Sequence, residues 1–324
     1  MKEYIISEKE SNQRIDKYVK KVLNEAPLSF IYRLFRVKDI KVNNKRVDIS
    51  YIVKQGDQVK IFISDSQLEE FSKKKEFKPV KANIDIVYED ENILIVNKPR
   101  GILVHGDENE KRITLSNQVL NYLFSKNEYD PSDNQAFIPG PAHRLDRNTS
   151  GLVLFGKNLI ALQELFELIK EKENISKHYY ALVNGRINKD GIINKPLRKD
   201  EKHNIVVVDS IERGAKEAIS KYSVKENFPL YTLMDVELIT GRTHQIRVHF
   251  SSIKHPLIGD SKYGDFSENK KFEKKYKFHD QFLHAYKIVF HNVEGKLAYL
   301  SNKTFIGEMP RIEKEILSRL KEGN

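Results

Sequence analysis

The chain of 324 residues contains no cysteine. Disulfides, zinc sites with cysteine ligands and thiol catalysis are therefore excluded for this sequence. No stretch approaches the run of about 18 apolar residues that a membrane-spanning helix needs, and residues 1–10 lack the apolar core of a signal peptide. We therefore expect a cytoplasmic protein that does not contact a membrane.

Positive charge is the strongest signal in the composition. Lysine and arginine total 56 residues against 46 aspartates and glutamates, a formal net charge of +10 at pH 7. This surplus favours a polyanionic partner, most simply a nucleic acid, although a generally basic protein would share the same total. The length allows one large domain and one small domain. No long exposed apolar stripe is evident, so we expect a monomer.

Residues 1–64 have the pattern of a small α/β domain. Apolar residues recur at helical spacing over 12–25, and Pro27 ends that helix before a second short one. Asn43-Asn44 and Gly56-Asp57 mark turns beside short strands. The basic residues along one side of this domain are candidate contacts for a polyanion, and they are Arg33, Arg36, Lys38 and Lys41.

A change of pattern separates two domains. Residues 65–80 are polar, charged and without apolar periodicity, which is typical of a linker. Residues 81–324 then mix strands and helices without a regular βαβ alternation, which predicts an α+β domain with a largely antiparallel sheet and flanking helices. The predicted elements are a hairpin over 84–96, a helix over 158–172, strands at 178–184, 204–208, 218–225 and 230–239, and a closing helix within the last twenty residues.

The most informative stretch is HRLDRNTSG, residues 143–151, followed by an apolar run at 152–155 that predicts a buried strand. It places Asp146 between two arginines, beside residues that favour turns. A carboxylate in that setting suits covalent or general-base chemistry on an anionic substrate. It is also the ordinary pattern of a structural ion pair, and the residues by themselves leave both interpretations open.

Other chemistries fit the sequence poorly. His244 and His249 are five residues apart, whereas ligand pairs on a helix are three or four apart, so we expect no metal site. Ser150 lacks the GxSxG elbow of a hydrolase nucleophile. Glycoside hydrolysis usually needs two carboxylates, and this stretch supplies only Asp146.

Four separated segments, in the same order, resemble the RluA family of RNA pseudouridine synthases. They are NKPRGILVH (97–105), the segment around Asp146, KHYYALV (177–183) and GRTHQIRVHF (241–250). Residues 1–64 resemble the RNA-binding domain of the ribosomal protein S4 type. The two resemblances together cover nearly the whole chain.

The resemblance implies three catalytic residues. Asp146 corresponds to the catalytic carboxylate, and Arg247 to the arginine that pairs with it. The family spacing selects Tyr179, and not Tyr180, as the aromatic residue of the active site. A tyrosine there can stack on uracil and offers a hydroxyl for proton transfer, and the two tyrosines of a strand point to opposite faces.

The resemblance also implies RNA contacts. Arg144 would fill the gap that the flipped uridine leaves in the RNA stack, whereas Arg242 and His244 would touch phosphate. Residues 255–264, HPLIGDSKYG, would shape the RNA surface, and the basic side of residues 1–64 would bind RNA as well.

Three positions depart from the family patterns. Arg100 stands where a small residue is common, Gly156 where alanine is usual, and Lys38 at a turn where many such domains have glycine. Gly156 should preserve its strand, Arg100 leaves the contacts of its turn open, and Lys38 predicts a different turn after the second helix. Thr243 is a plausible N-cap for a helix that carries Arg247.

The implied activity is the isomerisation of specific uridines to pseudouridine in RNA, with no cofactor and no metal. By analogy the substrate is large-subunit (23S) ribosomal RNA or a pre-ribosomal particle. The same chemistry on transfer RNA or another RNA is an alternative. An alternative of another class is a non-catalytic RNA-binding or ribosome-assembly protein that keeps the fold.

Overall fold

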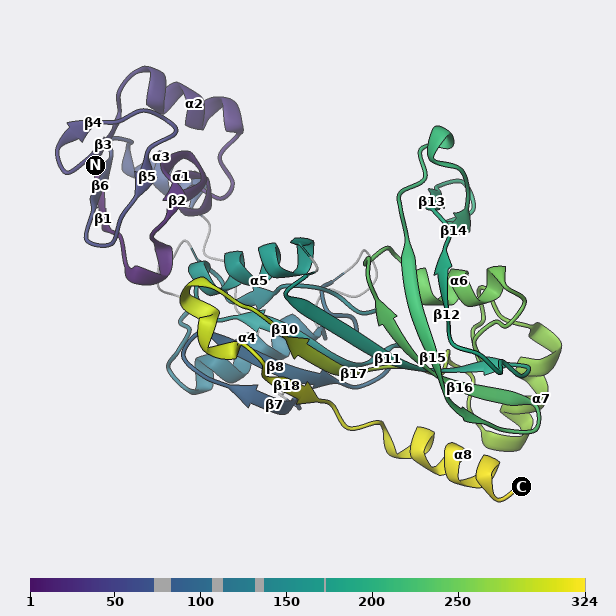
Figure 1. Ribbon diagram of the computed structural model, residues 1–324. Helices are drawn as coiled ribbons and strands as arrows, with labels where there is room; N and C mark the ends of the chain where they lie inside the picture. Colours follow the sequence, from purple (N-terminus) through teal and green to yellow (C-terminus); the bar gives the residue numbers. More distant parts are fainter. Residues whose placement is uncertain (73–82, 107–112, 132–136, 172, 324) are drawn as a thin grey trace.

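The computed structural model describes residues 1–72, 83–106, 113–131, 137–171 and 173–323. The chain forms a small N-terminal unit and a larger unit built on one long sheet (Figure 1). The N-terminal elements are β1 (Lys2–Ile5), η1 (Glu8–Glu10), β2 (Gln13–Arg14), α1 (Ile15–Val22), α2 (Leu28–Arg36), β3 (Ile40–Val42), β4 (Lys45–Arg46), β5 (Ile52–Val53), β6 (Gln58–Ile61) and α3 (Asp65–Phe71).

The N-terminal unit forms as its sequence pattern predicts. The predicted helix over 12–25 is α1, which buries its apolar residues against a four-stranded sheet of order β1-β6-β3-β4. Asn43 and Asn44 both have positive φ in the tight turn between β3 and β4, a conformation that asparagine tolerates better than most residues. Lys38, which follows α2, has a φ of 69°. This lysine therefore adopts the left-handed backbone conformation that glycine would favour.

The prediction of an unpatterned linker is wrong for its first residues, because α3 occupies Asp65–Phe71. Ser64 caps this helix by accepting a hydrogen bond from the Gln67 amide, and the Gln67 side chain accepts one from the Ser64 amide. Phe71 packs against Phe30 with ring centroids 4.7 Å apart. These contacts outweigh the polar composition, while residues 73–80 of the predicted linker lie outside the described residues.

The larger unit contains a ten-stranded sheet. Its order is β12-β15-β16-β11-β17-β10-β8-β7, with β18 beside β17 and β9 beside β10. All described pairs are antiparallel except β10 with β17, which confirms the predicted largely antiparallel α+β class. The strands are β7 (Asp85–Glu89), β8 (Ile93–Lys98), β9 (Gly140–Pro141), β10 (Ser150–Gly156), β11 (Ile175–Asn184), β12 (Gly191–Asn194), β15 (Ile219–Asn227), β16 (Tyr231–Leu238), β17 (Leu283–Phe290) and β18 (Thr304–Ile306).

Helices cover both faces of this sheet. One face packs against α4 and α6, and the other against α5. A separate hairpin, β13 with β14, projects from the sheet (Figure 1). These elements are α4 (Leu115–Ser125), α5 (Leu159–Glu171), β13 (Leu197–Asp200), β14 (Ile205–Val208), η2 (Ile211–Arg213), α6 (Gln245–Ser252), α7 (Phe266–Tyr276), η3 (Gly295–Leu300) and α8 (Arg311–Lys321). No helix of the described residues is long and apolar enough to cross a membrane.

Strand β10 is buried on both faces, which explains its continuous apolar run. Val153 and Phe155 face the cluster under α4 and α6, whereas Leu152 and Leu154 face the cluster under α5. A strand in this position holds the loop before it against a rigid layer. That loop carries Asp146.

Candidate active site

Asp146 lies at a cavity of about 640 Å³. The loop between β9 and β10 supplies Asp146, β11 supplies Tyr179, and the start of α6 supplies Arg247. The three candidate catalytic residues are far apart in the sequence and line the same cavity. Its wall also contains three of the candidate RNA contacts, namely Arg144, Arg242 and His244.

The guanidinium of Arg247 joins Asp146 to a second carboxylate. Its Nη1 donates to Asp146 Oδ2 at 2.9 Å. Its Nε and Nη2 donate to Asp260 Oδ2 and Oδ1 at 2.7 and 2.9 Å. Asp260 is thus a bidentate partner that fixes the plane of the guanidinium and aims its remaining edge at Asp146.

Charge and burial act against each other in this triad. Burial by itself would lower the pKa of Arg247, but hydrogen bonds and charges from Asp260 and Asp146 raise it above its ordinary value. Burial would likewise raise the pKa of Asp260, yet Arg247 holds that pKa below its ordinary value. Asp260 is 1% exposed, so neither charge would be stable there without the other.

The helix that carries Arg247 begins differently from the prediction. His244, with a φ of 53°, occupies the N-cap position of α6, and no side chain caps the helix. The prediction of Thr243 as N-cap is therefore wrong. The Gln245 side chain instead fixes the loop before the helix, because its Oε1 accepts from the Arg242 amide at 3.0 Å and from the Thr240 hydroxyl at 2.7 Å.

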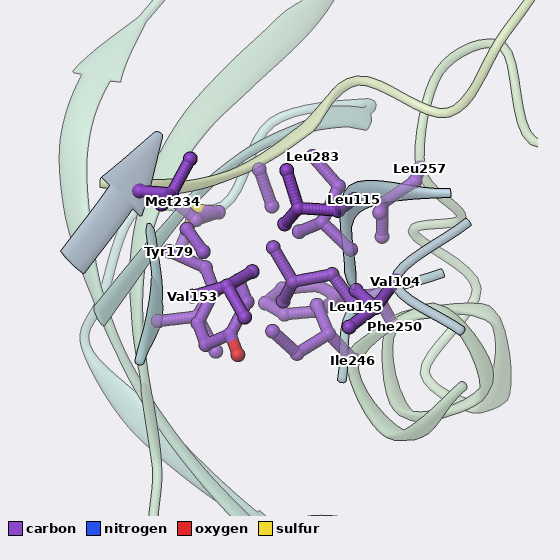
Figure 2. Packing of buried hydrophobic residues seen from close by; sticks show 14 of the residues in the cluster. Val104, Leu115, Leu145, Val153, Tyr179, Met234, Ile246, Phe250, Leu257 and Leu283 are labelled. Carbon is purple, nitrogen blue, oxygen red and sulfur yellow. The ribbon is translucent and has the colours of Figure 1, made fainter. Parts of the chain in front are cut away.

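Tyr179 is buried in the apolar cluster beside the cavity. Figure 2 shows it in the same cluster as Leu145 and Ile246, and it is 6% exposed. Tyr180 faces a different cluster on the other side of the sheet, as the alternation of a strand requires. Burial, and next the charge of Asp146, raise the pKa of Tyr179. Its hydroxyl therefore stays protonated at neutral pH and can donate a hydrogen bond.

His244, which we expected to touch RNA phosphate, lies beside the Asp146 carboxylate. Its Nε2 is 3.8 Å from Asp146 Oδ2, and its Nδ1 is 2.7 Å from the Tyr263 hydroxyl. Burial lowers its pKa, although Asp146 opposes the shift. Arg144 is exposed at the cavity, and Arg242 donates from Nε to the Glu217 carbonyl at 2.8 Å.

Two further residues of the cavity were not selected from the sequence. Lys177 has no acceptor for its amino group within the described part of the chain, and burial lowers its pKa to about 8. His143 accepts a hydrogen bond at Nε2 from the Leu154 amide at 3.3 Å. Burial, and then Lys177, lower the pKa of His143 to about 3. The cavity thus holds a neutral histidine and a lysine whose amino group has no acceptor among the described residues.

Lys98 donates hydrogen bonds to the turn after β8 and to the loop that carries Asp146. It is 1% exposed, and its Nζ donates to the carbonyls of Pro99, Ile102 and Arg147 at 2.9, 2.9 and 3.0 Å. Burial, and then the charge of Arg100, lower its pKa to about 7. The sequence did not indicate that Lys98 would bind the Asp146 loop or that Asp260 would bind Arg247. In a sequence, a charged residue beside a turn looks like a surface residue.

Comparisons with known proteins identify the family. A family model described as RNA pseudouridylate synthase matches residues 92–252, and a model of the S4 domain matches residues 13–59. An uncharacterized RNA pseudouridine synthase of Mycoplasma capricolum is 34% identical over 94% of this chain and 97% of that protein. The chain belongs to the RNA pseudouridine synthase family.

Other relatives and solved structures agree with this membership. Ribosomal large subunit pseudouridine synthase D of Buchnera aphidicola is 35% identical over 87% of this chain and 88% of that protein. The structure of human RNA pseudouridylate synthase domain containing 4 matches with a TM-score of 0.57 and 24% identity, over 73% of this chain and 93% of that one, which shows a shared fold. The predicted resemblance is confirmed.

The family membership also confirms the predicted class of enzyme. RNA pseudouridine synthases isomerise uridine to pseudouridine, and the S4 domain adds RNA binding. The four candidate contacts of that domain, Arg33, Arg36, Lys38 and Lys41, are not among the residues that line the cavity. Arg33 and Arg36 are exposed on α2. Their role in RNA binding, the roles of the cavity residues and the predicted domain boundaries stay predictions.

Proposed function

We propose that the protein converts specific uridines of large-subunit (23S) ribosomal RNA to pseudouridine, as a cytoplasmic monomer. Relatives from Buchnera and Vibrio are named ribosomal large subunit pseudouridine synthases D and C. A net charge of +10 suits a large polyanionic substrate. The observation that carries the proposal is the hydrogen-bonded chain from Asp260 through Arg247 to Asp146, because it holds the Asp146 carboxylate at the cavity in one orientation.

The reaction rearranges one nucleotide without adding or removing a group. The bond between ribose C1′ and uracil N1 breaks, the base turns, and C1′ bonds to C5; C5 loses its proton and N1 gains one. Asp146 is the proposed nucleophile or base, and it attacks the sugar, attacks the ring or removes a ribose proton. Arg247 holds its carboxylate in one orientation, and Tyr179 stacks on the detached uracil while the apolar wall excludes water.

The target base must leave the RNA stack to reach Asp146. Flipping costs a few kcal/mol of unstacking, and contacts with phosphate offset that cost. In the proposal Arg144 fills the vacated space, Arg242 and His244 contact the RNA near the cavity, and the basic side of the S4 domain binds RNA elsewhere. RNA affinity should therefore fall steeply as salt is added.

Pseudouridine mapping tests the proposal. Ribosomal and transfer RNA would be compared from cells that lack the protein and from cells complemented with wild type, Asp146→Asn or the control Asp209→Asn. Asp209 pairs with Arg198 at a partly exposed site. We expect 23S sites to vanish without the protein and to return with wild type and Asp209→Asn only.

Each other outcome contradicts a definite part of the proposal. Loss of sites in transfer RNA alone would show that the substrate is another RNA. Restoration by Asp146→Asn would remove Asp146 from the mechanism. If no site depended on the protein, the non-catalytic alternative, an RNA-binding or ribosome-assembly protein, would replace it.

A further inference from the structure

Arg100 extends from the turn after β8 into the protein. Its side chain is 13% exposed. Its Nε donates to Glu313 Oε1 at 2.5 Å, and its Nη1 donates to the carbonyls of Asn148 and Gln281 at 2.9 and 2.7 Å. The guanidinium also lies 4.6 Å from the ring centroid of Phe278. One arginine thus joins its own turn to three other segments of the chain.

Glu313 anchors the other end of this contact. It lies in the first turn of α8, its side chain is fully buried, and Arg100 is its only ion-pair partner within the described residues. Burial raises the pKa of Glu313 to about 7, and Arg100 opposes that shift. A buried carboxylate is costly without a partner, so the position of α8 depends on Arg100. The position of the Arg100 side chain likewise depends on Glu313 in α8.

The contact reaches Asp146 through the backbone. Asn148, whose carbonyl accepts from Arg100, comes two residues after Asp146, and the Thr149 amide donates to the Asp146 carbonyl at 3.1 Å. The Asn148 side chain is also fixed, because its Nδ2 donates to Asp280 Oδ1 at 2.6 Å. Arg100 is absent from the cavity wall, so it acts on the carboxylate only through this loop.

We propose that Arg100 and Glu313 are positioning residues, through which helix α8 holds the loop that places Asp146 in the cavity. The inference rests on the proposed function of Asp146. A carboxylate displaced by about 1 Å reacts far more slowly even when substrate still binds. Breaking the Arg100–Glu313 contact therefore lowers the rate of the chemical step and leaves RNA affinity unchanged.

The test measures single-turnover rate, RNA affinity and thermal stability on the full chain, at a temperature where every variant is folded. We expect Arg100→Gln to lower the rate about 10- to 100-fold with a Kd close to wild type. Glu313→Ala should match it, whereas Glu313→Gln, which keeps an acceptor, should restore most of the rate. Arg100→Gln combined with Glu313→Ala should be no slower than the worse single variant.

A matched control separates positioning from general support of the fold. Ile316 is 2% exposed on the same helix, and Ile316→Ala removes packing of α8 while leaving the Arg100–Glu313 pair in place. It should lower stability without lowering the single-turnover rate. If Arg100→Gln does not fold, Arg100→Lys takes its place, with an intermediate rate expected because lysine lacks the fork geometry of arginine.

Three results would overturn the inference. They are a wild-type rate for Arg100→Gln, an equal loss of rate for Ile316→Ala, and a loss confined to RNA affinity. Absence of pseudouridine formation by wild type would instead refute the proposed function, so the two failures are distinguishable.

Discussion

Replacement of Asp260 tests whether Arg247 and Asp146 act as one unit. Asp260→Ala removes two hydrogen bonds to Arg247, of 2.7 and 2.9 Å, and leaves a buried guanidinium with Asp146 as its remaining carboxylate. Removing one partner of a buried ion pair costs about 3–5 kcal/mol, so the free energy of unfolding should fall by about that amount. Asp260→Asn keeps one acceptor and should lose about 1.5–3 kcal/mol, the contribution of one hydrogen bond to a charged group.

The rate should fall as well, because Arg247 no longer has a fixed plane from which to orient Asp146. A loss of about 1.5–3 kcal/mol in the transition state corresponds to about a 10- to 150-fold lower rate. Release of tritium from RNA labelled at uracil C5 measures the rate, and urea unfolding measures stability. Since Arg247 holds the pKa of Asp260 below 3.8, the difference in stability between wild type and variant should shrink in acid below that pH.

Asp209→Asn is the matched control, because Asp209 pairs with Arg198 at 2.7 Å in a partly exposed hairpin. An exposed pair of this kind contributes less than about 1 kcal/mol. Wild-type stability and rate in Asp260→Asn would refute the reasoning. A loss of stability with an unchanged rate would show that Arg247 needs Asp260 for folding but not for orienting Asp146.

Three further predictions concern Tyr179 and Lys177 at the cavity and the buried His284 of strand β17. Tyr179→Phe should keep the rate of tritium release within about tenfold of wild type, because the ring can still stack on uracil. Tyr179→Ala should lower that rate further and should also lower the free energy of unfolding in urea by about 3–5 kcal/mol. Lys177 lines the cavity, and we expect it to contact an RNA phosphate. Lys177→Met should therefore weaken RNA binding and reduce the slope of log Kd against log salt by about 0.7 to 1, the value for one lost phosphate contact. An unchanged slope would exclude a phosphate contact of Lys177. Burial lowers the pKa of His284 from 6.5 to about 4, so the unfolded chain binds more protons than the folded chain between these pH values. Stability should therefore fall as the pH drops through this range. His284→Gln should flatten the plot of unfolding free energy against pH.

Local pattern in the sequence was enough to predict much of the fold. The helical spacing of Ile15, Tyr18 and Val22 predicted α1, and the alternation before the turn at 89–92 predicted the β7–β8 hairpin. Helix α3 was missed because its stability comes from a cap at Ser64 and packing of Phe71 on Phe30. Strand β17 was also missed, although it lies in the middle of the sheet between β10 and β11.

The candidate site also contains residues that could be predicted from the sequence and contacts that could not. The resemblance to the family motifs selected Asp146, Tyr179 and Arg247, and the structure brings all three to one cavity. The motifs gave no reason to place Asp260 behind Arg247 or His244 beside Asp146. The Asp260 contact depends on how residues 255–264 return to α6 after the helix ends, and the His244 contact depends on how the start of α6 packs beside the Asp146 loop.

The sequence by itself determined most helices and several strands, including β7, β8 and β10, because side-chain periodicity is a local pattern, and its resemblance to family motifs supplied the candidate site residues. Only the tertiary structure decided which charges are paired beyond Asp146 and Arg247, whose pairing the family resemblance had implied. Arg100 and Glu313 are 213 residues apart in the chain, and no local pattern can show that one will neutralise the other. Burial makes such a pairing necessary, since a charge removed from water is stable only beside its partner, and burial is a property of the completed fold.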